Sequence, residues 1–324
     1  MSKSKKNPNN TDAVDYNDLE KYISKARLSS YGQIVRKKNK KNLVAAYLWN
    51  KHVSSAVYPI LQCLEITLRN ALHEAGSKHF LASDWYDRAM KYGGDEKFIS
   101  QASTLEIKFF RKSAGYKKVQ GKKAWVSNHE NMLRNVKNKL LRDGKNITPD
   151  AVISETMFGF WVGLFEDAYS GTDPKKTIWP HIEPTIFPNI ATSNRKLAHN
   201  KLLKLKTLRN RMSHHEPIWK DKNVIDDKTA VEFLNQRIDE ALILIKDMSK
   251  ERHQYLIRSG KVAYFRGICN EKTLLHYIKG DNIRTLDKRK IRRVVTRALK
   301  EPQILPSIVS VQGIPKVVID LWPA

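Results

Sequence analysis

Apolar side chains recur at intervals of three and four residues over a long stretch in the first quarter of the chain. This spacing places them on one face of an α-helix. The positions that follow it are Leu43, Ala46, Tyr47, Trp49, Val53, Val57, Ile60, Leu61, Leu64, Leu68 and Leu72. Pro59 interrupts the pattern, and proline removes a backbone donor and crowds the preceding turn. We therefore expect a kink, or two abutting helices, at Pro59.

The same periodicity predicts further helices over about 16–28, 127–142, 194–215 and 228–249. A start signal lies at Thr148-Pro149-Asp150, because proline fits the first turn of a helix. We expect an aromatic-rich core helix to follow it. Its core residues would be Val152, Ile153, Met157, Phe158, Phe160 and Trp161. Three prolines, Pro180, Pro184 and Pro188, predict an irregular connector over 171–190.

The two ends of the chain have a different character. Residues 1–15 are polar and rich in Asn, Ser and Lys, which predicts a disordered basic tail. From about Glu251 a small basic domain is expected, with a cationic helix over Leu286–Lys300. It would end in a β-hairpin formed by 308–311 and 317–321 and joined through Gln312–Pro315. The expected fold class is mainly α: a helical bundle over 16–250 with a small C-terminal α+β appendage over 251–324.

The net charge of the chain indicates what kind of partner it binds. The 324 residues include 59 Lys and Arg against 33 Asp and Glu, a net charge of +26. Such an excess favours a nucleic acid, because each cation on a phosphate releases counterions, although a charged surface can also serve solubility alone. A flexible basic loop is expected over 105–125. Basic stretches at 36–41, 112–123 and 286–300 could form an RNA-tracking surface, although such stretches are usually solvated faces. The contacts expected on the last are Lys288, Arg289, Arg292, Arg293 and Arg297.

Other bulk features narrow the class of protein. Cys63 and Cys269 are far apart in the sequence and predict buried, reduced thiols rather than a disulfide framework. No apolar run reaches the roughly 20 residues of a membrane span. The basic N-terminus has no apolar segment of a secretory signal. We expect a cytoplasmic protein with no membrane partner and no cofactor or metal.

Residues 205–219 carry the candidate chemistry. Leu202, Leu205, Leu208 and Met212 have helical spacing and should face the core. Pro217 cannot continue a helix, so the helix should end near His214 or His215. Asn210 and His214, and likewise Arg211 and His215, are four apart and share a face. Arg209 and His214 lie roughly 140° apart around a helix. They can converge only if the last turn unwinds or a second copy contributes.

This set of side chains suits RNA cleavage by the strand's own 2′-hydroxyl. An imidazole can take or give a proton near neutral pH, and an arginine can clamp a phosphate and stabilise its developing charge. Asn210 could hold the imidazole tautomer or a phosphate oxygen, and no metal is required. Two other interpretations remain open. Cations favour helix C-termini in any case, and paired histidines can bind metal, although adjacent helical residues point apart.

Three segments together resemble a known family. Arg209-Asn210-Arg211-Met212-Ser213-His214 matches the R-x4-6-H motif of HEPN ribonucleases, and Leu208–Ile218 resembles the signature of their Abi-like branch, the bacterial abortive-infection proteins. Residues 65–71, preceded by 47–50, resemble the N-terminal helix of that branch. Residues 158–161 resemble its central aromatic motif. The resemblance covers roughly 16–250.

The resemblance implies a HEPN-like helical bundle that dimerises, with the arginine and histidine of each copy lining one cleft. It implies metal-independent endoribonuclease activity that leaves a 2′,3′-cyclic phosphate, in phage defence or toxin–antitoxin control. Arg209 would bind phosphate and His214 would be the acid–base. Asn210, Arg211, His215 and Glu216 would support them. RNA, a second copy, and a small regulatory RNA or antitoxin are the expected partners.

A polar stripe on the long N-terminal helix is a further candidate. Glu65, Arg69 and His73 follow each other at intervals of four, and Asn70 is adjacent. The stripe is either an exposed stabilising pair or, as the resemblance suggests, turned inward to support the 209–216 motif. We interpret Phe158–Trp161 as core packing rather than a surface for base stacking.

Two other functions fit parts of the sequence. One is a non-catalytic RNA-binding protein that sequesters RNA or forms a complex with a small regulatory RNA. The presence of both Arg209 and His214 favours an enzyme over this alternative. A DNA-binding regulator is less favoured, because no helix-turn-helix pair is recognisable.

Overall fold

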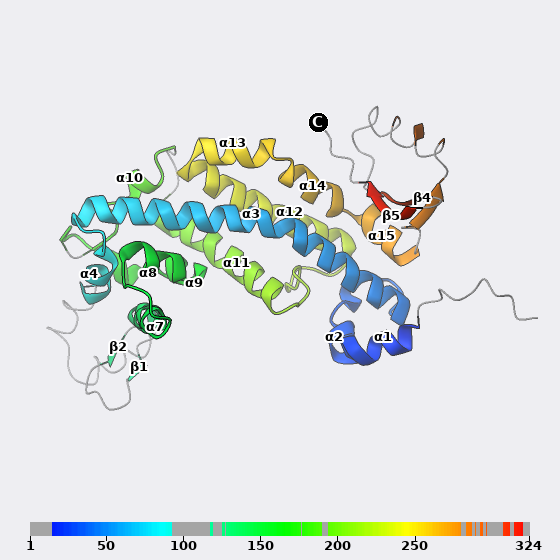
Figure 1. Cartoon of the computed structure of the whole chain (residues 1–324), viewed down its shortest axis with the longest axis horizontal. Coiled ribbons are helices and arrows are strands. Elements are labelled where there is room, and N and C mark those ends of the chain that lie inside the picture. The colour runs from blue at the N-terminus through cyan, green and yellow to red at the C-terminus, as the bar shows by residue number, and fades with distance from the viewer. Residues whose placement is uncertain are drawn as a thin grey trace, which may run out of the picture. The chain divides into compact units, whose positions relative to one another are not determined.

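The structure is a computed structural model of the whole chain (Figure 1). It describes residues 15–92, 117–118, 125–126, 128–175, 177–189, 194–279, 283–286, 289, 292–293, 296, 307–311 and 314–319. The fold is mainly helical and forms a helical bundle, which confirms the expected class. It divides into two compact units, the first assigned to Met1–Val57, Arg211–Gln236 and Val262–Ala324 and the second to Tyr58–Asn210 and Arg237–Lys261. We call them the terminal unit and the central unit.

Three long helices contribute several residues to both units, and α14 (Lys261–Ile268) contributes its first residue to the central unit and the rest to the terminal unit. The long ones are α3 (Lys40–Phe80), α11 (Arg195–Ser213) and α12 (Asp227–Met248). The expected break at Pro59 is wrong in one respect, because α3 is a single helix with Pro59 inside it rather than two abutting helices. Proline leaves the carbonyl four residues earlier without its helical donor. That carbonyl belongs to Ser55, an exposed residue, so water can satisfy it.

The terminal unit begins with α1 (Tyr16–Ile23), α2 (Lys25–Ser29) and η1 (Gly32–Ile34). One helix was expected over 16–28, but the chain breaks at Ser24, whose φ is 74°. The Ser24 hydroxyl accepts the backbone N–H of Arg27 at 3.3 Å, so it caps the second helix. Lys40 of α3 joins α1 through an ion pair with Glu20 at 2.5 Å.

Two later helices, α14 (Lys261–Ile268) and α15 (Glu271–Lys279), pack on the first part of α3. Buried Trp49 donates from Nε1 to the backbone oxygen of Ile268 at 3.1 Å, and its ring lies 5.2 Å from that of Trp219. The ring nitrogens of His52 bond the hydroxyls of Tyr277 and Tyr264, at 2.8 and 2.9 Å. These interactions tie 262–279 to α3. A separable domain beginning at residue 251 stays a prediction.

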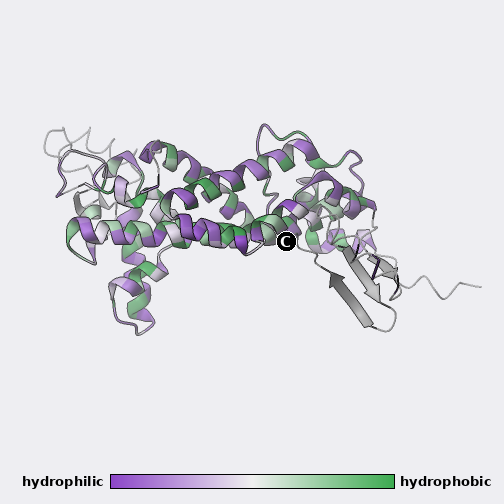
Figure 2. Cartoon of the chain, turned by 90° about the horizontal axis from the view of Figure 1, so that it is seen from above, coloured by the Kyte–Doolittle hydropathy of each residue, from purple (hydrophilic) through white to green (hydrophobic). Residues whose placement is uncertain are grey.

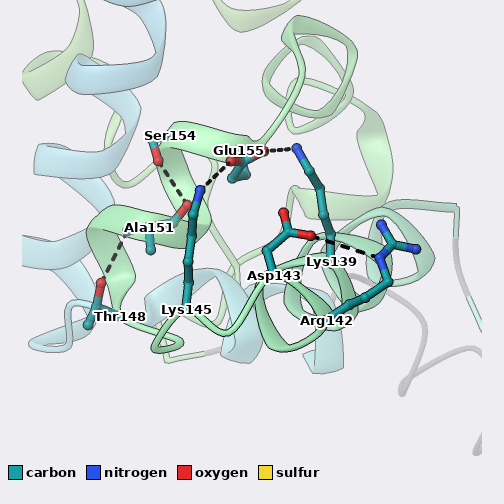
Figure 3. Close-up of polar contacts among 8 residues, drawn as sticks. All are labelled: Lys139, Arg142, Asp143, Lys145, Thr148, Ala151, Ser154 and Glu155. Carbon is teal, nitrogen blue, oxygen red and sulfur yellow. Dashed lines mark hydrogen bonds and ion pairs between the residues drawn. The ribbon is translucent and has the colours of Figure 1, made fainter.

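The central unit contains most of the remaining helices. They are α4 (Trp85–Tyr92), α7 (Asn128–Arg142), α8 (Pro149–Glu155), α9 (Phe158–Gly163), η2 (Asp167–Tyr169), α10 (Glu183–Ile186) and α13 (Lys250–Arg258). The predicted start at Thr148 is confirmed, since its hydroxyl accepts the N–H of Ala151 at 3.2 Å (Figure 3). At the other end of α8, Glu155 pairs with Lys139 and Lys145, which joins the helix to α7 and the turn after it.

The aromatic helix expected after Thr148 is divided in two. Thr156 ends α8, because its hydroxyl donates to the backbone oxygen of Ile153 at 2.7 Å and its backbone turns extended. Phe158, Phe160 and Trp161 of α9 are buried, so their interpretation as core is confirmed, whereas Met157, at the break between the two helices, is exposed and its expected burial is wrong. Gly163 lies against buried His129, where any Cβ would overlap Nε2 of the ring.

The connector over 171–190 includes the short helix α10 and a cis peptide at Trp179–Pro180. The stretch over 105–125 lies mostly outside the described residues; within them, β1 (Lys117–Lys118) pairs antiparallel with β2 (Trp125–Val126). Near the C-terminus β3 (Ile283–Leu286) pairs parallel with β4 (Ser307–Val311), and β4 pairs antiparallel with β5 (Ile314–Ile319). The predicted hairpin is thus present, with its second strand starting three residues earlier.

Two expectations about residue environment can be compared with the structure. Cys269 is buried and Cys63 is half-buried, and both are free thiols.

The helices are amphipathic, with hydrophilic and hydrophobic residues alternating along them (Figure 2). Within the described ranges, every helix is too short or too polar to cross a bilayer. The proposed tail at 1–15 lies outside the described residues except for Asp15.

Candidate functional site

The motif helix α11 ends in a left-handed turn. Its last helical residue is Ser213, and His215 has a φ of 57°. The N–H of His215 donates to the oxygen of Met212 at 3.1 Å, and that of Glu216 to Arg211 at 2.9 Å. These two bonds form a Schellman motif, in which glycine normally occupies the position of His215. The prediction that the helix ends near His214 or His215 is confirmed.

Three side chains of the terminal unit hold the backbone of this turn. Arg27 Nη1 donates to the oxygens of His214 and His215, at 3.4 and 3.1 Å. The Tyr31 hydroxyl also donates to His215, at 3.1 Å. Burial raises the pKa of Tyr31 well above its usual range, so the phenol stays protonated and remains a donor.

Buried Asn50 is the third of these side chains, and it bonds the backbone on both sides of Pro217. Its Nδ2 donates to the oxygen of Glu216 at 3.2 Å, and its Oδ1 accepts the N–H of Ile218 at 3.0 Å. Pro217, Ile218 and Trp219 are buried, whereas the side chains of His214, His215 and Glu216 are exposed. The turn therefore has an anchored backbone and presents two imidazoles and a carboxylate to solvent.

The arginine of the motif has a different environment in the central unit. Arg209 is half-buried on α11, and its charge acts on the carboxylate of Glu65 in α3. Glu65 also accepts the backbone N–H of Phe158 at the start of α9. Burial raises the pKa of Glu65, and Arg209, Arg69 and the Phe158 bond oppose that rise. The Glu65 carboxylate thus bonds the start of α9 and lies within the electrostatic influence of Arg209.

The predicted polar stripe on α3 is only partly a unit. Glu65 faces Arg209 and Phe158 as described, and Arg69 Nε is 3.5 Å from the Asn70 oxygen, with Asn70 exposed. His73 serves another purpose, since its Nδ1 accepts Trp85 Nε1 at 3.2 Å. His73 thus helps to hold α4, and burial lowers its pKa.

The remaining candidates are distributed as follows. Asn210 is exposed, and Arg211 is half-buried with a buried Nη1 that has no hydrogen-bond partner among the described residues. Leu202, Leu205 and Leu208 are buried as expected, whereas Met212 is half-buried.

Arg289, Arg292 and Arg293 are helical and exposed, and Lys288 and Arg297 lie outside the described residues. Among described side chains, no group of three or more His, Cys, Asp or Glu could hold a metal.

Sequence reasoning missed the residues that position the turn. Arg27 and Tyr31 were not singled out, and Asn50 was named only within the resembling segment 47–50. One signal was present in the sequence: Asn50 is a polar residue among the apolar positions of a core helix, and a buried amide needs partners. Nothing in the sequence indicated that its partners lie beside Pro217.

The fold and this motif define a class: a helical bundle with an arginine and a histidine at the end of one helix. The chain belongs to the family of Abi-like proteins, whose family description matches residues 11–220, well over half of it. No curated protein and no solved structure matches the chain.

Proposed function

We propose that this Abi-like protein is a metal-independent endoribonuclease of the HEPN type. It would act in phage defence or as the toxin of a toxin–antitoxin pair. The observation that carries the proposal is the presentation of His214, whose side chain is exposed on a turn with a backbone fixed by Arg27, Tyr31 and Asn50. Family membership and the Arg209–His214 spacing support it.

The proposed chemistry needs only these side chains and the RNA. An imidazole removes the proton from a 2′-hydroxyl, the 2′-oxygen attacks the adjacent phosphorus, and the bond to the 5′-oxygen breaks with return of a proton. The products are a 2′,3′-cyclic phosphate and a free 5′-hydroxyl. Arg209 would stabilise the charge that develops on the phosphate. Glu65, which acts electrostatically on Arg209, would position its guanidinium.

We propose further that the active form is a homodimer. Arg209 and His214 are five residues apart, which on a continuing helix would place them roughly 140° apart. Two copies that bring their motif helices together would supply an arginine and a histidine to each phosphodiester. Sedimentation at concentrations that bracket the working range would measure the state, and a fully active monomer would contradict this part.

The test is cleavage of a labelled oligoribonucleotide in the presence of EDTA, with the product ends mapped. We expect the full-length protein to cleave and to leave cyclic phosphates, and His214→Ala and Arg209→Ala to be inactive but folded by circular dichroism. Arg258→Ala is the matched control, since Arg258 is exposed on α13. Cleavage by His214→Ala at the rate of the unaltered protein would exclude the proposal.

The second candidate, a non-catalytic RNA-binding protein, is favoured by the net charge of +26 and by exposed Arg289, Arg292 and Arg293. RNA that co-purifies with the unaltered protein and with His214→Ala distinguishes the two. If the co-purified RNA ends in cyclic phosphate with the unaltered protein but not with His214→Ala, the result supports the ribonuclease. The same intact RNA from both supports sequestration or a small regulatory RNA partner.

The C-terminal cations are proposed to bind RNA in either case. Replacing Arg292 and Arg293 with glutamine should reduce the slope of log Kd against log salt concentration, by about 0.7 for each single-strand phosphate that is no longer neutralised. An unchanged slope would remove these residues from the RNA-binding surface.

A further inference from the structure

Two cations of the terminal unit are connected to the turn that carries His214, Arg27 directly and Lys51 through aromatic side chains. Arg27, on α2, is exposed, and one of its guanidinium nitrogens lies 3.1 Å from the backbone oxygen of His215. A guanidinium has five N–H donors. The bonds to His214 and His215 come from Nη1 alone, so donors remain for another acceptor at this position.

Lys51, on α3, is connected to the His214–Glu216 turn by a series of contacts through two tyrosine rings. Its Nζ lies 5.3 Å from the centre of the Tyr47 ring, and that ring packs edge-on against Tyr31 at 5.5 Å. The Tyr31 hydroxyl in turn bonds the oxygen of His215. Two tyrosine rings, Tyr47 and then Tyr31, therefore connect Lys51 to the turn.

The charges of Arg27 and Lys51 act on each other. The pKa of Lys51 is lowered first by burial and then by the positive charge of Arg27. Within the described part of the chain, no carboxylate forms an ion pair with either cation. Glu216, on the turn itself, acts electrostatically on Tyr31. Two like charges held together are unfavourable unless an anion joins them.

We propose that Arg27 and Lys51 bind a backbone phosphate of the RNA next to the phosphodiester that His214 attacks. This inference rests on the proposed function, and it adds a substrate subsite outside the Arg209–His214 motif. A phosphate at this place would accept from the free guanidinium donors and neutralise the ammonium group. The strand would then be held on one side of the scissile bond by residues that take no part in the chemistry.

The test measures binding without cleavage, in the His214→Ala protein. The probe is a fluorescein-labelled oligoribonucleotide of mixed sequence, titrated at several salt concentrations. For Arg27→Gln and for Lys51→Gln we expect the slope of log Kd against log salt to fall by about 0.7, which at 0.15 M salt corresponds to a Kd about fourfold higher. Lys272→Gln, at an exposed lysine on α15, is the control with no change.

Arg27 also holds the turn, so its replacement can act through structure alone. Lys51→Gln removes no hydrogen bond to the turn and keeps the test decisive. Slopes for Lys51→Gln and Arg27→Gln that match Lys272→Gln would overturn the subsite. A reduced slope, together with an unaltered protein that does not cleave RNA, would sustain the subsite and refute the ribonuclease, so the two failures are distinguishable.

Discussion

Asn50 and Ile218 are joined by a buried hydrogen bond of 3.0 Å that spans 168 positions of the chain. The same amide bonds the oxygen of Glu216, so one side chain satisfies both backbone groups that flank Pro217. Proline cannot donate, and the residue before it is restricted to extended conformations. The position of His214 therefore depends on a residue of α3 as well as on its own helix.

Removing that amide should destabilise the protein. Asn50→Leu leaves the N–H of Ile218 and the oxygen of Glu216 without partners, and we expect a loss of about 2–4 kcal/mol in the free energy of unfolding. Urea unfolding at neutral pH measures it. Asn70→Leu, at an exposed position of the same helix, should change little. Equal losses for the two variants would contradict a stabilising role for the two hydrogen bonds of Asn50.

The left-handed residue His215 offers a second test. Glycine has no Cβ and adopts this conformation freely, so His215→Gly should raise stability by about 1 kcal/mol. His215→Ala keeps the Cβ and should bring no such gain. Thermal unfolding compares them, and the cleavage assay on the same two proteins shows whether the imidazole is needed. Equal stability of the glycine and alanine variants would argue against a strained turn.

We expect Glu65 to support RNA cleavage without stabilising the folded protein. Burial raises the pKa of its carboxyl despite Arg209 and Arg69, so the native state disfavours the charged form relative to the unfolded chain. Its contribution to stability falls as pH rises through the native pKa. We expect Glu65→Gln to unfold at equal or higher urea at pH 7.5 and to cleave RNA more slowly, because Arg209 loses its opposing charge.

The control for Glu65 is Glu74→Gln, an exposed glutamate paired with Lys78 at 2.6 Å. It should alter neither stability nor cleavage appreciably. A Glu65→Gln protein that is less stable at pH 7.5 but cleaves normally would reverse both parts of the prediction and leave Glu65 a structural residue.

Acid should destabilise the central unit through His129. Burial, with a smaller effect of Lys206, lowers the pKa of this imidazole to about 4, and Nδ1 bonds the Tyr169 hydroxyl at 2.7 Å. Between about pH 6.5 and 4 the unfolded chain takes up a proton that the native state does not. Stability present above pH 6.5 is then lost on acidification, by up to about 3 kcal/mol.

Urea unfolding across this pH range measures the effect. His129→Gln carries no titrating group and should show a smaller loss between pH 6.5 and 4 than the unaltered protein. Parallel curves for the two proteins would show that His129 takes up its proton equally in both states.

The sequence by itself determined the long helices α3, α7, α11 and α12, the start of α8 at Thr148 and the end of α11 before Pro217. These features depend on periodicity, capping and proline geometry, which act over a few residues. It also placed Phe158, Phe160 and Trp161 in the core, since large aromatic side chains gain most from burial. Local rules erred at Ser24 and Thr156, where the Ser24 hydroxyl caps a new helix and the Thr156 hydroxyl ends one, and at Pro59 they left two alternatives, of which two abutting helices is excluded.

Only the tertiary structure decided what surrounds the motif. The partners of His215 and Glu216 are Arg27, Tyr31 and Asn50, and the charge that acts on Glu65 is that of Arg209. These groups are between 144 and 188 positions apart along the chain. Their meeting is set by how apolar faces pack, because a buried polar group bonds whatever donor or acceptor the packing brings to it.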